Sequence, residues 1–112
     1  MASLPKYQVF KSTSNSEYYY RLRSSNNEII LNGEGYKSKQ SCYDGINAVR
    51  INALIDSRYD RKDSYSNYTF NLKAGNGEII GRSENYNSSY GRDNGIAAVK
   101  RDAPVAQIED LT

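Results

Sequence analysis

The strongest constraint on this chain is an internal duplication. Residues 18–53 align with residues 68–103 at a constant offset and without a gap. The apolar and glycine positions that are identical in both copies are Tyr18/Tyr68, Leu22/Leu72, Ile29/Ile79, Ile30/Ile80, Gly45/Gly95, Ile46/Ile96, Ala48/Ala98, Val49/Val99 and Ala53/Ala103. A duplication in register predicts that both copies form the same supersecondary unit, so each prediction made for one copy has to hold for the other.

Each copy begins with an alternating pattern that is typical of a half-buried β-strand. Tyr18, Tyr20 and Leu22 fall on one side of such a strand and the residues between them on the other, and residues 68–73 repeat the pattern. Turn-forming residues follow at 25–27 and 75–77, and apolar residues come next at 29–31 and 79–80. This order predicts one antiparallel hairpin in each copy.

A helix is predicted at the end of each copy. In the first copy Ile46, Val49 and Ala53 recur at helical spacing, Cys42 extends their stripe as a small core residue, and Ser38 stands where an N-cap is expected. The glycines at 45 and 95 cost about 1 kcal/mol each relative to alanine inside a helix, which indicates a close contact with a neighbouring element. Residues 7–11 and 58–62 have room for a further strand, so each copy is predicted to be a β-β-β-α unit.

The two units together predict one α+β domain. A unit of about 50 residues has a marginal core by itself, and packing two of them together solves that problem. We therefore expect a single domain over residues 1–112, with an antiparallel sheet packed against two helices and related by a pseudo-twofold axis. Its parts are repeat 1 (7–53), a linker (54–57), repeat 2 (58–103) and a C-terminal tail (104–112) whose order the pattern leaves open.

Composition excludes several kinds of functional site. With His 0 and Cys 1, the chain lacks a Ser-His-Asp or Cys-His nucleophile, a Cys/His zinc site and an internal disulfide, and no cofactor is expected. A net charge of +2 is too small to attract nucleic acid over long distances. No apolar stretch is long enough to span a membrane and the start, MASLPKYQVF, has no signal-peptide pattern, so we expect a cytoplasmic protein with no membrane partner.

The sequence segments shared by the two copies resemble those of a known family. Copy one contains YRLR at 20–23, NNEII at 26–30 and GINAVR at 45–50, and copy two contains FNLKA at 70–74, NGEIIG at 76–81 and GIAAVK at 95–100. These segments resemble the YegP-like family of small bacterial proteins, over about residues 7–103 and the closing residues 109–112. The resemblance implies a tandem β-β-β-α fold and no established activity, and it supplies no catalytic residues.

A set of polar residues is identical in the two copies. Most of its members fit structural roles, because Asn26 and Glu28 belong to a hairpin turn and Tyr36 and Ser38 to the start of a helix. A second interpretation brings Glu34 and Glu84 together across the pseudo-twofold axis as paired carboxylates, for acid–base chemistry or for a hard cation. The repeat-shared polar set comprises Asn26, Asn76, Glu28, Glu78, Glu34, Glu84, Tyr36, Tyr86, Ser38 and Ser88.

The candidate binding surface lies on the outward side of the alternating strands at 18–23 and 68–73. Tyr19, Arg21 and Arg23 share one strand side, and Lys73 is the second copy's counterpart of Arg23. Aromatic and cationic side chains on a sheet can bind single-stranded nucleic acid, but Tyr and Arg are also enriched in protein interfaces. We therefore expect a non-enzymatic binding or structural module, with a protein partner or self-association ahead of nucleic acid and of a Glu34/Glu84 enzyme or cation site. Four tyrosines, Tyr19, Tyr43, Tyr65 and Tyr90, have no tyrosine as a counterpart in the other copy, and any function specific to this chain is expected among them.

Overall fold

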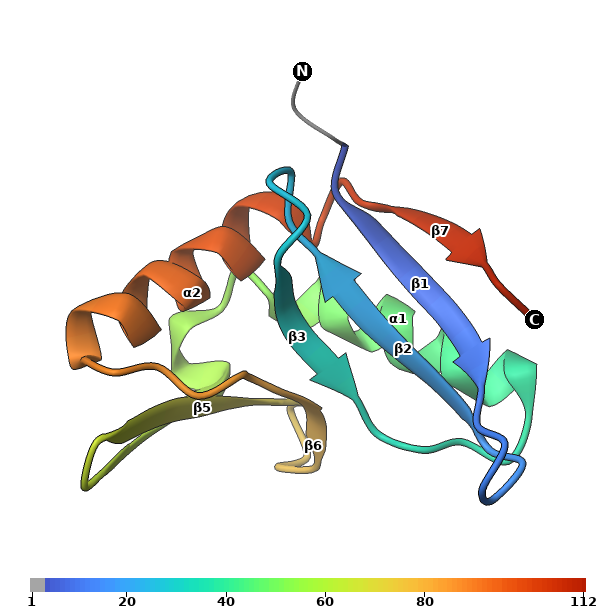
Figure 1. Cartoon of the computed structure of the whole chain (residues 1–112), viewed down its shortest axis with the longest axis horizontal. Coiled ribbons are helices and arrows are strands. Elements are labelled where there is room, and N and C mark those ends of the chain that lie inside the picture. Colours follow the sequence, from blue (N-terminus) through green and yellow to red (C-terminus); the bar gives the residue numbers. More distant parts are fainter. Residues whose placement is uncertain (1–3) are drawn as a thin grey trace.

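The computed structural model describes residues 4–112 and shows one seven-stranded sheet with two helices (Figure 1). Residues 1–3, which the predicted domain includes, lie outside the described range. The strands lie in the order β4-β5-β6-β3-β2-β1-β7, and α1 packs on β2 while α2 packs on β5. The elements are β1 (Lys6–Lys11), β2 (Tyr18–Arg23), β3 (Ile29–Gly33), α1 (Lys39–Asn52), the short 3-10 helix η1 (Asp56–Arg58), β4 (Tyr59–Ser64), β5 (Asn67–Lys73), β6 (Ile79–Arg82), α2 (Ser89–Asp102) and β7 (Gln107–Asp110).

The predicted tandem α+β fold is confirmed. β1–β3 with α1 and β4–β6 with α2 are the two β-β-β-α repeats, and they join where β3 pairs antiparallel with β6. Asn32 lies opposite Arg82 in that pairing, and these two residues are each other's counterparts in the duplication. The pseudo-twofold axis therefore passes between β3 and β6, and the two repeats share one continuous sheet and one core.

A β-bulge at the same place in both repeats turns extra apolar side chains toward the core. Leu22 pairs with Leu31 while Arg23 pairs with Ile29, which leaves Ile30 as an extra residue in β3. Ile30 and Leu31 are consecutive and both are buried, which an unbroken strand would not allow. The register shifts in repeat 2 at the equivalent point, between Leu72 and Lys73.

Two buried tyrosines connect the strands β1 and β4 to the ends of the helices. The Tyr7 hydroxyl donates to the Ala103 carbonyl at the end of α2, and the Tyr59 hydroxyl donates to the Ala53 carbonyl at the end of α1, both at 2.6 Å. Each bond satisfies a helix-terminal carbonyl that has no partner within its own helix. Tyr7 pairs with Leu22 and Tyr59 with Leu72, so the two tyrosines are equivalent although their spacing differs from that of the duplication.

The C-terminal tail adds one parallel pairing to the predicted antiparallel sheet. β7 pairs parallel with β1, so the sheet is mixed, and Ile108 packs against the core. The reason lies in the Tyr7–Ala103 contact, which places the end of α2 beside the start of β1, so the chain that leaves α2 runs alongside β1 in the same direction. Asp110 holds the end of the tail by accepting from Lys39 Nζ at 3.0 Å and from the Thr112 backbone N–H at 2.9 Å.

Docking of the tail is expected to weaken in acid. Hydrogen bonds from Thr112 and from Lys39 hold the pKa of the Asp110 carboxyl well below its usual value. The pKa of Asp110 is lower in the folded protein than in the unfolded chain, where an aspartate has a pKa of about 3.9. The Asp110 carboxylate therefore stabilises the folded protein above that pH, and this stabilisation is lost as the pH falls from the unfolded pKa toward the folded one. In urea titrations between pH 6 and pH 3, Asp110→Asn should therefore be less stable than wild type at pH 6 and should lose less stability than wild type on acidification. Identical slopes for the two proteins would contradict this role of Asp110.

Candidate functional site

Tyr19, Arg21 and Arg23 lie together on the outward side of β2, opposite the side that carries the buried Tyr20 and Leu22. Phe10 of β1 pairs with Tyr19, and the two rings stack with their centroids 5.9 Å apart and an interplanar angle of 18°. The Arg21 guanidinium lies over the Phe10 ring, 4.7 Å from its centroid. The outward side of β1 and β2 thus carries a stack of two aromatic rings and one cation, a typical cation–π arrangement.

Gln8 organises the two arginines of this surface. Its Oε1 accepts from Arg21 Nε at 2.8 Å and from Arg23 Nε at 2.7 Å, while its Nε2 donates to Glu109 Oε1 of β7 at 2.7 Å. A neutral amide therefore fixes both guanidinium groups without neutralising them. We call the group formed by Gln8, Phe10, Tyr19, Arg21 and Arg23 the aromatic–cationic patch.

Lys73 is not part of the aromatic–cationic patch. It lies on β5, three strands from β2 in the sheet order, which corresponds to roughly 14 Å at the usual strand spacing. Its Nζ forms an ion pair with Asp60 of β4 at 3.3 Å. At the positions of Tyr19 and Arg21 repeat 2 has Thr69 and Asn71, so the aromatic–cationic patch is a property of repeat 1.

Phe10 and Gln8 belong to the aromatic–cationic patch but not to the candidate surface predicted from the sequence. The signal for them is the alternation in β1, where the buried Tyr7 and Val9 leave Gln8 and Phe10 on the outward side. Their partners on β2 follow only from the strand register.

Glu34 and Glu84 each contact the opposite repeat. Glu34 Oε1 accepts from Arg82 Nε at 2.9 Å, and Glu84 Oε2 accepts from Asn32 Nδ2 at 3.2 Å. The contacts obey the pseudo-twofold symmetry, because Asn32 and Arg82 are counterparts, and both carboxylates connect β3 with β6. Within residues 4–112 the structure shows no group of three or more His, Cys, Asp or Glu side chains placed to hold a metal ion.

The serines and asparagines of the repeat-shared polar set stabilise turns and helix starts. Ser38 and Ser88 are the N-caps of α1 and α2, and their hydroxyl oxygens accept from the backbone N–H of Ser41 and of Gly91 at 3.0 Å. In the hairpin turns, Oδ1 of Asn26 accepts from the Glu28 N–H at 3.1 Å and Oδ1 of Asn76 accepts from the Glu78 N–H at 3.0 Å. These contacts fix the turns from which Glu28 and Glu78 project.

Glu28 and Tyr86, which belong to different repeats, meet where the repeats pack together. They line a cavity of about 320 Å³ between the β2–β3 turn and α2. Burial, together with the nearby carboxylates of Glu84 and Glu28, raises the pKa of the Tyr86 hydroxyl, so the hydroxyl stays protonated at neutral pH. The opposite junction is built alike, because Tyr36 lies against Gly45 as Tyr86 lies against Gly95. Burial, together with nearby acidic groups that include Glu34 and Glu78, raises the pKa of Tyr36 as well. We call the cavity at Glu28 and Tyr86 the seam groove.

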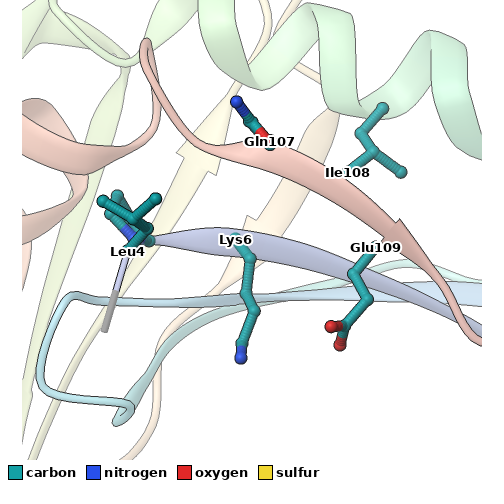
Figure 2. A pocket seen from close by; sticks show the side chains of 6 residues that line it. Leu4, Lys6, Gln107, Ile108 and Glu109 are labelled. Carbon is teal, nitrogen blue, oxygen red and sulfur yellow. The ribbon is translucent and has the colours of Figure 1, made fainter.

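A second hollow, of about 400 Å³, lies where β1 and β7 begin, and it marks a free edge of the sheet (Figure 2). Lys6 and Glu109 point to one side of the two strands in this view, and Ile108 points to the other side, toward α1. β7 is the last strand in the sheet order, so its outer backbone groups have no strand partner within residues 4–112. β4 ends the sheet on the other side and carries charged residues at 60–63, a pattern typical of a protected edge.

Comparison with known proteins identifies relatives for both repeats. The family model described as "Domain of unknown function (DUF1508)" matches residues 14–60 and again residues 63–110. Among curated proteins, the UPF0339 protein YegP of Yersinia pestis is 40% identical over 60 residues, which are 54% of this chain and 53% of that protein. A UPF0339 protein of Bordetella pertussis is 50% identical over 55 residues, 49% of each chain. The chain thus spans about half the length of these curated relatives.

Two solution NMR structures have the same fold over nearly the whole chain. A UPF0339 protein from Shewanella oneidensis superimposes with a TM-score of 0.90 at 38% identity, covering 96% of this chain and 92% of that one. The protein of unknown function yegP from E. coli superimposes with a TM-score of 0.90 at 35% identity, covering 100% of this chain and 97% of that one. In the part of the chain that the structure describes, neither α1 nor α2 is long and apolar enough to cross a membrane.

Proposed function

We propose that this chain, which belongs to the DUF1508 family of domains of unknown function, is a non-enzymatic protein-interaction module that binds its partner through the aromatic–cationic patch. The observation that carries the proposal is the stack of Tyr19 on Phe10 with the Arg21 guanidinium over the Phe10 ring. Aromatic and arginine side chains are enriched in protein interfaces, and Tyr and Arg are frequent among the few residues that supply most of the binding energy. Here they are held in place before binding, which lowers the entropy that binding costs.

The charge around the aromatic–cationic patch favours a protein over nucleic acid. Glu109 lies beside the patch on β7, and Glu34 and Asp60 lie farther along the sheet, where they pair with Arg82 and Lys73. Phosphate binding needs a continuous cationic track, and these carboxylates interrupt it. A protein partner with an acidic or aromatic segment matches two fixed guanidinium groups next to the half-buried rings of Phe10 and Tyr19.

The test uses the duplication to design a variant that should fold. The double variant Tyr19→Thr/Arg21→Asn places on β2 the residues that repeat 2 already has on β5, and Lys73→Ala on repeat 2 is the control. In affinity purification from cells of the source organism, with quantitative mass spectrometry, wild type and Lys73→Ala should retain a common protein. The double variant should recover at least about tenfold less of that protein.

Two results would overturn this proposal. Equal recovery of the partner by the double variant would show that the aromatic–cationic patch is not the contact surface. A partner that disappears after nuclease treatment, together with binding of a labelled single-stranded oligonucleotide that falls steeply with salt, would favour nucleic acid instead.

A further inference from the structure

We propose that the seam groove is a second binding site, separate from the aromatic–cationic patch, and that it takes a small organic molecule through an ammonium or guanidinium group. The groove is assembled from both repeats, with the β2–β3 turn of repeat 1 on one side and α2 of repeat 2 on the other. At about 320 Å³ it lies at the lower end of the usual range for small-molecule sites. The class of ligand follows from charge, aromatic surface and shape.

The uncompensated charge in the seam groove is negative. Glu28 lines the groove and forms no ion pair within residues 4–112. Arg101 also lines it, but both oxygens of Asp102 accept from that guanidinium, Oδ1 from Nε and Oδ2 from Nη2, each at 2.9 Å. The positive charge is therefore compensated and the Glu28 carboxylate is free, which favours a cationic ligand.

Tyr86 supplies the aromatic surface that a cation needs. It lies in the groove together with Glu28, and the raised pKa of its hydroxyl arises from burial and from the Glu84 and Glu28 carboxylates nearby. A carboxylate next to an aromatic ring attracts an ammonium or guanidinium group twice, by charge and through the ring quadrupole. The side-chain amides of Asn26 and Asn94 add polar groups to the wall.

The shape of the groove fits a slender, partly apolar stem. Its floor contains Ile30 of β3, and the wall formed by α2 presents Gly91, Gly95 and Ala98. Residues 91–101 of a helix extend about 15 Å, so the groove is longer than a single ionic contact requires. Repeat 1 has Ser41 at the position of Gly91, so a side chain stands there at the opposite junction of the repeats.

The test compares three probes of equal length and different charge. The ¹⁵N-labelled full chain is titrated by NMR with n-butylammonium, n-butanol and butyrate. n-Butylammonium should produce saturable chemical-shift changes at residues 24–30 and 91–101, with an affinity at least about tenfold higher than that of the neutral and anionic probes. Comparable affinity for butyrate or n-butanol, or the absence of saturable shifts with n-butylammonium at millimolar concentrations, would overturn the proposal.

Two variants and one control locate the binding. Glu28→Gln, at an exposed position, should weaken n-butylammonium binding at least about tenfold. Gly91→Ser introduces the residue of the opposite junction and should weaken binding by filling the groove. The control Glu78→Gln changes the matching carboxylate of that junction and should leave the shifts at 24–30 and 91–101 unchanged. Unaltered binding by Glu28→Gln, or an equal loss in Glu78→Gln, would show that the cation does not bind in the seam groove.

Discussion

Gly33→Ser is expected to lower the free energy of unfolding by about 3 kcal/mol, although repeat 2 has a serine at the equivalent position. The Tyr20 ring lies across Gly33, and a Cβ there would clash with three ring atoms, of which Cζ at 2.7 Å is the most distant. The ring cannot move aside because Tyr20 is fully buried and its hydroxyl donates to the Ile80 carbonyl of β6 at 2.5 Å. Domains of this size are stable by about 5–15 kcal/mol, so the loss should be plain in urea or thermal unfolding.

The duplication supplies both a rescue and a control for this prediction. Tyr20→Phe/Gly33→Ser copies the Phe70/Ser83 pair of repeat 2, and it should recover at least about half of the loss because the ring is no longer anchored to β6. Gly75→Ser, which copies Ser25 of repeat 1, is the control, since a Cβ there has only the flexible end of the Arg58 side chain nearby, at 3.3 Å. A Gly33→Ser protein as stable as Gly75→Ser would show that the Tyr20 ring can relax.

Local patterns explain why so much of the fold can be predicted from the sequence. The hairpins and the helix starts depend on neighbouring residues, and each pattern occurs twice in the chain, as with the caps Ser38 and Ser88. Other features depend on pairing between distant residues. β7 pairs with β1 across nearly the whole chain and has no counterpart in repeat 1, and the equivalence of Tyr7 and Tyr59 is hidden because their spacing differs from that of the duplication.

The candidate sites are less predictable than the fold, because they too depend on pairing between residues that are distant in the sequence. Tyr19 and Arg21 could be placed on one strand side, but Phe10 joins them only through the register of β1 with β2. Lys73 was predicted with them because its counterpart is Arg23, yet the pseudo-twofold axis moves it to the other half of the sheet. A duplicated residue occurs in two symmetry-related places, so likeness of sequence does not mean closeness in space.

Arg92 shows how the two repeats differ inside the core. It occupies in α2 the position that Cys42 holds in α1, and it is buried although it is charged. Asp63 of β4 accepts from its guanidinium, as does Asp93 at 3.0 Å. A buried arginine is tolerated because these carboxylates compensate its charge, and one of them, Asp63, lies on β4, the charged edge strand that repeat 2 alone leaves uncovered.

Gly45→Ala is expected to destabilise the protein by about 1–3 kcal/mol, although alanine has a higher helix propensity than glycine. Alanine at a free helix position would gain about 1 kcal/mol over glycine. At Gly45, however, a Cβ would lie 2.7 Å from Cζ of Tyr36 and closer still to its hydroxyl oxygen, so the helix could not keep its distance from that ring. Gly95 has the same relation to Tyr86, so Gly95→Ala should show a loss of similar size in urea unfolding.

Gly91→Ala separates this contact from the general effect of glycine in a helix. Gly91 lies in α2, but a Cβ there meets its nearest neighbour, Ser88 Oγ, at an ordinary distance of 3.4 Å. Gly91→Ala should therefore raise the stability, by up to about 1 kcal/mol. Replacing the ring as well, in Tyr36→Leu/Gly45→Ala, should cost less than the sum of the two single changes, because the clash is present only when ring and Cβ coexist. Additive losses, or a gain for Gly45→Ala like that for Gly91→Ala, would show that the tyrosine does not require the glycine.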